Sequence, residues 1–225
     1  MSAYVYALLA DPPRADAGPG LGDEPLRYLP VAGLLAAVGD MAAPPPVSRT
    51  TLLAHDAVVR RLAAAVDAIL PVRFGTLLAG DAALADTLAE RAPRLREALA
   101  LVAGREQMTL RVFGEAASPP APVPGTSDPG PGTRYLEGRR QQARRDAEVP
   151  ELAPLRPHLA PLVRAEHAQR HDAPPLIASV YHLVDRGRAG AYLDALAAGA
   201  AALAPTRAAA TGPWPPYAFA PEHLG

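Results

Sequence analysis

Proline sets the limits on what this chain can fold into, because 27 prolines among 225 residues repeatedly interrupt its apolar stretches. The densest run lies between Glu115 and Thr133, where six prolines and three glycines stand close together. Proline fixes its own backbone and donates no hydrogen bond, so this stretch cannot form a regular helix or strand. We therefore predict a Pro/Gly-rich linker over residues 115–133, between an N-terminal domain, residues 1–114, and a C-terminal domain, residues 134–225.

The rest of the composition is that of a globular protein. Proline and glycine together make up one residue in five, below the roughly 25–30% that marks low-complexity chains. Hydrophobic residues make up 49% but aromatic residues only 5%. The core must therefore consist mainly of Ala, Leu and Val.

Two missing residue types exclude several kinds of chemistry. The sequence contains neither lysine nor cysteine, and its formal net charge is −1. These absences exclude a phosphate-binding P-loop lysine, a Schiff-base lysine, a thiolate nucleophile, an iron–sulfur cluster and a cysteine zinc site. The charge gives no general attraction to nucleic acid or to anionic membranes.

The chain ends and apolar stretches show no targeting or membrane-spanning pattern. The first residues, MSAYVYALLAD, lack the basic start of a signal peptide. No stretch approaches the ~20 continuous apolar residues that a membrane-spanning helix needs. With no cysteine for disulfides, these observations lead us to expect a cytoplasmic protein.

Apolar spacing predicts α+β structure in both domains. Ser48, Thr50 and Thr51 are candidate N-caps for a helix to about Leu70. Pro93 should kink or divide a second helix that starts at Asp81. The expected strands are 3–9, 26–31, 34–38, 72–74 and 106–113 in the first domain and 176–184 and 206–211 in the second. The other expected helices are 135–147, 151–171 with proline interruptions, and 189–203.

Histidines supply one candidate for chemistry. His167 and His171 are four residues apart, a spacing that places both on one face of a helix, as zinc ligands can be. The metalloprotease pattern has Glu directly after the first His, whereas Glu166 precedes it here. A metal- or acid/base-dependent enzyme using His167, His171 and Glu166 is one alternative, against a solvated helix end. Hydrolase chemistry has less support, because Ser179 stands in mid-strand and no serine lies in a G-x-S-x-G elbow.

The one basic run, Arg139–Arg145, supplies a second candidate. Four arginines in seven residues can contact phosphates, but Glu137, Asp146 and Glu148 dilute their charge. We interpret the run as a solvated helix face. An acidic protein partner, or a nucleic-acid or regulatory ligand, is the alternative.

The C-terminal sequence GPWPPY predicts a rigid strap. Pro213, Pro215 and Pro216 hold the backbone extended, and Trp214 and Tyr217 project from it. We expect these aromatic rings to pack on the apolar face of the C-terminal half. A recognition surface is the alternative, since Trp and Tyr often anchor interfaces.

Several stretches together resemble the GvpF/GvpL family of gas vesicle proteins, in order and over essentially the whole chain. They are Tyr4-Val5-Tyr6, His55-Asp56-Ala57-Val58-Val59, Leu70-Pro71-Val72-Arg73-Phe74-Gly75-Thr76, Gly132-Thr133-Arg134-Tyr135-Leu136, Ala178-Ser179-Val180-Tyr181-His182-Leu183-Val184 and Thr211-Gly212-Pro213-Trp214-Pro215-Pro216-Tyr217-Ala218-Phe219.

The resemblance implies a cytoplasmic, gas-vesicle-associated protein of two small α/β domains with ferredoxin-like elements. It further implies an assembly or accessory role, with contacts to the small hydrophobic shell protein and to other accessory proteins. No enzymatic activity, catalytic residue, cofactor, metal, nucleic acid or membrane span is implied. Within the motifs, Arg73 is expected either to be a buried ion-pair partner of Asp56 or another carboxylate, or to make a surface contact.

Overall fold

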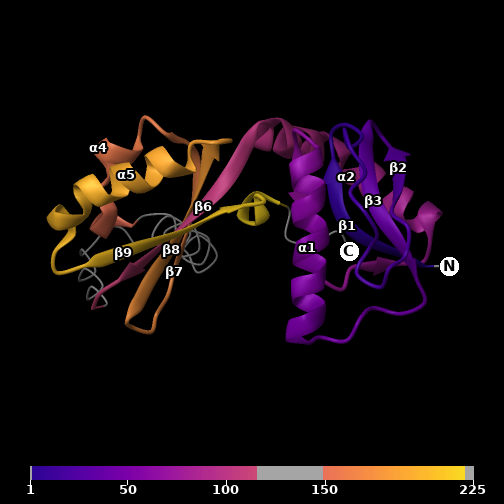
Figure 1. Cartoon of the computed structure of the whole chain (residues 1–225), viewed down its shortest axis with the longest axis horizontal. Coiled ribbons are helices and arrows are strands. Elements are labelled where there is room, and N and C mark those ends of the chain that lie inside the picture. The colour runs from indigo at the N-terminus through magenta and orange to yellow at the C-terminus, as the bar shows by residue number, and fades with distance from the viewer. Residues whose placement is uncertain (1, 116–148, 221–225) are drawn as a thin grey trace, which may run out of the picture. The chain divides into compact units, whose positions relative to one another are not determined.

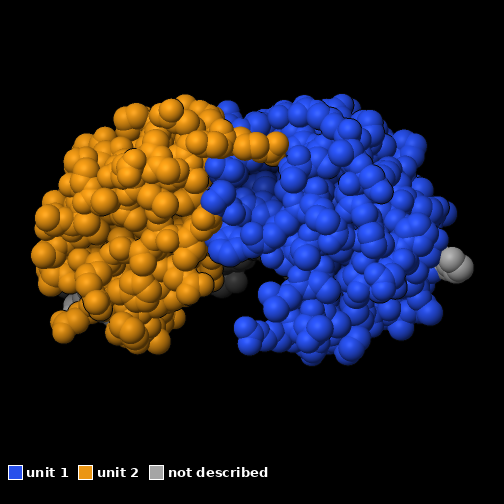
Figure 2. Space-filling view, viewed as in Figure 1, with its two compact units in different colours: residues 1–107, 213–225 blue, residues 108–212 orange. Residues whose placement is uncertain are grey.

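The chain forms two compact units, coloured separately in Figure 2. The computed structural model describes residues 2–115 and 149–220. Unit 1 comprises residues 1–107 and 213–225, and unit 2 comprises residues 108–212. The predicted linker lies outside the described residues except for Glu115, and the helix predicted at 135–147 lies outside them entirely.

Unit 1 is built on an antiparallel sheet with the strand order β2-β3-β1-β4, in which β5 also pairs with β1 (Figure 1). Its strands are β1 (Ser2–Leu9), β2 (Arg27–Val31), β3 (Leu34–Met41), β4 (Ile69–Pro71) and β5 (Leu77–Leu78). Its helices are α1 (Arg49–Ala65) and α2 (Asp81–Val102).

The core of unit 1 is centred on β1. Every residue from Ala3 to Leu9 is fully buried. Both faces of this strand are therefore covered, because successive side chains of a strand point to opposite faces. Tyr4 and Tyr6 pack with the apolar stripe of α1, which includes Val59 and Leu62. Helix α2 also contacts β1.

The helix boundaries differ from the sequence prediction in two places. Helix α1 ends at Ala65 rather than Leu70, because Ile69–Pro71 form β4, where Ile69 pairs with Leu9 of β1. Helix α2 continues through Pro93 without a break. It stops just before Gly104, whose φ of +66° is the left-handed conformation that often ends helices.

Unit 2 contains a four-stranded sheet with the order β7-β8-β6-β9 (Figure 1). The strands are β6 (Arg105–Phe113), β7 (Val163–Arg170), β8 (Leu176–Asp185) and β9 (Arg207–Trp214). The helical elements are η1 (Pro150–Leu152), α4 (Arg156–Leu159), α5 (Ala189–Gly199) and η2 (Ala200–Leu203). The predicted α+β class is confirmed, as is the interior position of the 176–184 strand.

The predicted helix over 151–171 is wrong beyond residue 162. Only two short helical pieces, η1 and α4, form before Pro161. Residues 163–170 form β7 instead, which pairs antiparallel with β8. The hydrogen bonds of that ladder outweigh the local helical tendency of the segment, an effect of tertiary context on a weak propensity.

The C-terminal strap belongs to unit 1. After β9, Pro215 and Pro216 are buried and Tyr217–Phe219 form the short helix η3, which contacts β4. The sequence predicted packing on the C-terminal half, but the strap's hydrogen bonds run to residues 56 and 107 of unit 1. Within the part of the chain that the structure describes, no helix is long and apolar enough to cross a bilayer.

Candidate functional site

Helix α1 contacts the other family-like stretches of unit 1. A capping box stabilises the first turn of this helix. The Ser48 side chain accepts a hydrogen bond from the Thr51 amide, and the Thr51 hydroxyl accepts one from the Ser48 amide. This capping box satisfies two amides that would otherwise have no partner in the helix. The predicted N-cap is thereby confirmed at Ser48, and the helix places His55 and Asp56 next to each other.

His55 is buried and joins three chain segments. Its Nε2 lies 3.3 Å from the Val72 carbonyl oxygen, which can only accept, so Nε2 carries the proton. Nδ1 then accepts from the Tyr4 hydroxyl at 3.0 Å, and that hydroxyl accepts from the Gly75 amide at 3.2 Å. Burial lowers the pKa of His55, which favours the neutral ring that this arrangement requires.

Tyr6 holds the loop between β1 and β2 by hydrogen bonds, as His55 holds the segments around it. Its hydroxyl donates to Glu24 Oε1 and accepts from the Leu21 amide at 2.8 Å, while the Gly22 amide donates to Glu24 Oε2 at 2.9 Å. Burial and the Glu24 carboxylate raise the pKa of Tyr6. The proline- and glycine-rich loop is thus fixed by side chains rather than by regular structure.

Asp56 connects α1 to the C-terminal strap. Its Oδ2 accepts from Arg60 Nε at 2.6 Å and its Oδ1 from the Tyr217 hydroxyl at 2.8 Å. The Arg60 guanidinium lies over the Trp214 ring, 4.3 Å from its centre, in a cation–π contact. Arg73 is exposed, and the partners of Asp56 are instead Arg60 and Tyr217.

The start of α1 carries an exposed apolar surface. Val47, just before the N-cap, is 83% exposed, and Leu52 and Leu53 are 43% and 58% exposed. Leu52 lies outside the core that Val58, Val59 and Leu62 of the same helix help to form. A hydrophobic staple between N′ and N4 would account for an apolar residue at positions 47 and 52, but not at 53. We call Val47, Leu52 and Leu53 the α1 apolar surface.

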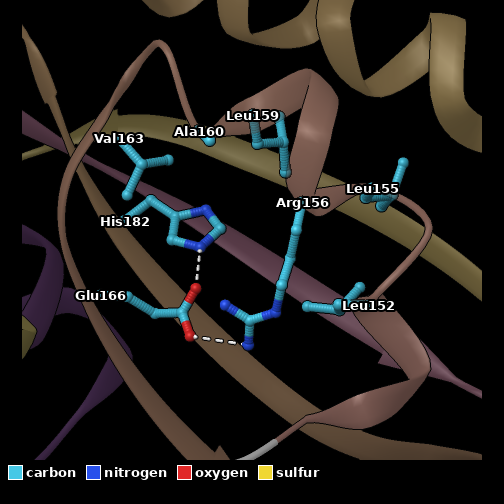
Figure 3. Close-up of a pocket in the computed structure, with 8 residues that line it drawn as sticks. All are labelled: Leu152, Leu155, Arg156, Leu159, Ala160, Val163, Glu166 and His182. Atoms are coloured by element: carbon cyan, nitrogen blue, oxygen red, sulfur yellow. Dashed lines mark hydrogen bonds and ion pairs between the residues drawn. The ribbon is translucent and has the colours of Figure 1, made fainter.

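Unit 2 contains a separate pocket of about 300 Å³, shown in Figure 3. His182 of β8 is 2% exposed, with Nδ1 2.7 Å from the Tyr192 hydroxyl and Nε2 2.9 Å from Glu166 Oε2. Glu166 Oε1 accepts from Arg156 Nη2 at 3.2 Å. The hydrogen bond from His182 lowers the pKa of Glu166, so this carboxylate is ionised at neutral pH.

The histidines of the alternative enzyme site do not assemble with Glu166. On β7, Glu166 pairs with His182 and His167 pairs with Tyr181, so Glu166 and His167 point to opposite faces of the sheet. His171 Nε2 instead lies 2.9 Å from the Ser179 hydroxyl. In residues 2–115 and 149–220, no three His, Asp or Glu side chains meet closely enough to hold a metal ion.

The other sequence candidates are less informative. The basic run Arg139–Arg145 and the stretch Gly132–Leu136 lie outside the described residues. The contacts of His182 with Glu166 and Tyr192 were missed, because they depend on the β7–β8 register and on α5. The only sequence signal was a histidine in an otherwise apolar strand.

The architecture of two α+β units is one already seen in solved structures. The crystal structure of the gas vesicle protein GvpF from Anabaena sp. PCC7120 matches with a TM-score of 0.70 at 16% identity, covering 99% of each chain. The crystal structure of GvpF from Microcystis aeruginosa matches with a TM-score of 0.71 at 17% identity, covering 98% of this chain and 99% of that one. At these identities the likeness establishes the fold.

Sequence comparison establishes the family. The model of the gas vesicle synthesis protein GvpL/GvpF family matches residues 2–221. Gas vesicle protein L2 of Halobacterium salinarum is 28% identical over 258 residues, covering 97% of this chain and 91% of the relative. The chain belongs to the GvpL/GvpF family and is a gas vesicle accessory protein.

Proposed function

We propose that this protein binds the small hydrophobic shell protein, and other accessory proteins, during vesicle formation in the cytoplasm. Its role there is to nucleate the wall or to act as a chaperone, without catalysis or a cofactor. The match of residues 2–221 to a gas vesicle synthesis family supports a role in vesicle formation. A wall subunit with apolar surfaces is prone to aggregate before assembly, and a partner that covers those surfaces prevents this.

The α1 apolar surface is the part of unit 1 that we assign to this contact. Three large apolar side chains within seven residues remain exposed, although Val58, Val59 and Leu62 of the same helix are buried in the core. Contact with an apolar partner would remove them from water, at about 25 cal/mol for each Å² buried. The capping box and the His55 network hold the helix, so the surface is formed before any partner binds.

Co-purification with the shell protein tests this proposal. Tagged wild-type protein, coexpressed with the shell protein, is expected to retain it, and the double variant Leu52→Gln/Leu53→Gln to retain several-fold less. The matched control is Leu193→Gln in α5, a comparably exposed leucine in unit 2. Equal retention by the double variant and the control would show that another surface binds. If the wild type retains no shell or accessory subunit, and deleting the gene leaves vesicle formation unchanged, the proposed function is wrong.

A further inference from the structure

The pocket of unit 2 has the composition of a small-ligand site. Its lining consists of five aliphatic residues and three polar ones, and its volume of about 300 Å³ is at the lower end of the range for such sites. Figure 3 shows the polar groups gathered at one end, with Glu166 between His182 and Arg156. The aliphatic members of the lining are Leu152, Leu155, Leu159, Ala160 and Val163.

The elements that form the pocket are held in place without a ligand. Arg170 of β7 forms a bidentate ion pair with Glu151 of η1, with N–O distances of 2.9 and 3.0 Å. Both carboxylate oxygens of Glu166 and both ring nitrogens of His182 already have partners. The cavity walls and the buried polar groups are therefore preorganised, which reduces the entropy cost of binding.

Arg156 is the one polar group of the lining with hydrogen-bond donors to spare. Among the described residues its guanidinium makes a single hydrogen bond, from Nη2 to Glu166, although it carries five N–H donors. The side chain lines the pocket and is 51% exposed, so a ligand can reach it. An anionic head group is the natural partner for the remaining donors, and carboxylates fit the guanidinium geometry well.

An anion can bind Arg156 without displacing Glu166. Unit 1 already contains an arginine between two carboxylates, since Arg27 donates to Asp40 at 2.6 Å and to Asp81 at 2.9 Å. The spare donors of Arg156 therefore favour a carboxylate.

We propose that this pocket binds a short aliphatic carboxylate, with the carboxylate on Arg156 and the aliphatic body against Leu152, Leu155 and Leu159. Two molecules share this chemistry: a free medium-chain fatty acid, and the C-terminus of a protein that ends in an apolar residue. The site is in unit 2 and is independent of the proposed function of the α1 apolar surface.

Isothermal titration of the full chain tests the proposal with two probes and their neutral counterparts. The probes are octanoate, compared with 1-octanol, and acetyl-Ala-Ala-Leu, compared with its C-terminal amide. We expect saturable binding of at least one carboxylate and about tenfold weaker binding of its neutral counterpart, because a hydrogen bond to a charged group is lost. Octanoate alone would identify a free fatty acid as the source, and the peptide alone would identify a protein C-terminus.

Three variants locate the site. Arg156→Gln should weaken carboxylate binding about tenfold, and Ala160→Phe should abolish it by filling the cavity. Arg164→Gln, which removes an exposed arginine paired with Asp185 outside the pocket, should leave binding unchanged. Circular dichroism checks that each variant is folded. The proposal is overturned if neither carboxylate binds, if the neutral counterparts bind equally well, or if Arg156→Gln and Ala160→Phe both bind as the wild type does.

Discussion

Gly39 shows how a single missing side chain permits a partly buried polar contact. It lies on β3, and a methyl group at this position would be 2.8 Å from Cγ of Glu24 and closer still to Oε1. The Glu24 carboxylate that accepts from Tyr6 therefore has room only because residue 39 is glycine. Its φ is not in the left-handed region, so space rather than backbone conformation is the reason.

Gly39→Ala is accordingly expected to lower the free energy of unfolding by roughly 1–3 kcal/mol, the usual cost of overpacking. Urea denaturation measures the change. Gly190→Ala is the matched control, because a methyl group there meets nothing within 4 Å. Alanine in that helix should be neutral or stabilising by up to about 1 kcal/mol. Equal effects of the two substitutions would contradict the packing argument.

The single residue His55 makes the free energy of unfolding depend on pH. Its pKa is lowered by burial from the ordinary value of 6.5, so between the folded-state pKa and pH 6.5 the unfolded chain binds a proton that the folded chain does not. The contribution of neutral His55 to the free energy of unfolding is therefore complete above pH 6.5, and it falls as the pH is lowered toward the folded-state pKa. The lowered pKa values of Glu151 and Glu166 act in the same direction, but only as the pH nears 4.5.

Between pH 7.5 and 5.5 we expect the wild type to lose stability in urea denaturation and His55→Gln to lose less. NMR titration of the His55 ring in the wild type provides a second reading that does not require the variant to fold. A His55 ring that titrates at or above pH 6.5 would contradict the assignment.

At the scale of elements, the strap is held to α1 by polar contacts as well as by packing. Tyr217→Phe removes the hydroxyl that donates to Asp56 and should cost roughly 0.5–1.5 kcal/mol of unfolding free energy. Tyr181→Phe is the control, because its hydroxyl makes no hydrogen bond among the described residues. If both variants lose the same stability, the contact with Asp56 contributes nothing.

Local sequence was sufficient to predict the cap of α1, whereas strand β7, which depends on pairing with a distant segment, was predicted wrongly. Ser48 was identified as a cap because capping depends on residues within one turn. Residues 163–170 were assigned to a helix because nothing nearby in the sequence reveals their pairing with β8. The same limit hid the pocket, since Arg156, Glu166 and His182 come from three different elements.

At the scale of the whole molecule, the chain order differs from the spatial order. Unit 1 is assembled from residues 1–107 and from the strap, with unit 2 inserted between them in the sequence. The Tyr217–Asp56 hydrogen bond joins residues 161 positions apart. The GPWPPY motif predicted a rigid strap, but a motif contains no information on which of two apolar surfaces it will cover.

This arrangement makes the stability of unit 1 depend on the last residues of the chain. Deleting residues 213–225 removes the buried Pro215 and Pro216, the contact of η3 with β4, and the amide of Ala218 that donates to the buried side chain of Gln107. The deletion removes this hydrogen bond together with the packing of Pro215 and Pro216, so the loss of unfolding free energy should exceed that of Tyr217→Phe. Hydrogen exchange read element by element should show faster exchange in β1 and β4, while β7 and β8 keep their protection, because they belong to unit 2. Faster exchange in β7 and β8 alone would assign the strap to unit 2 and contradict the discontinuous unit.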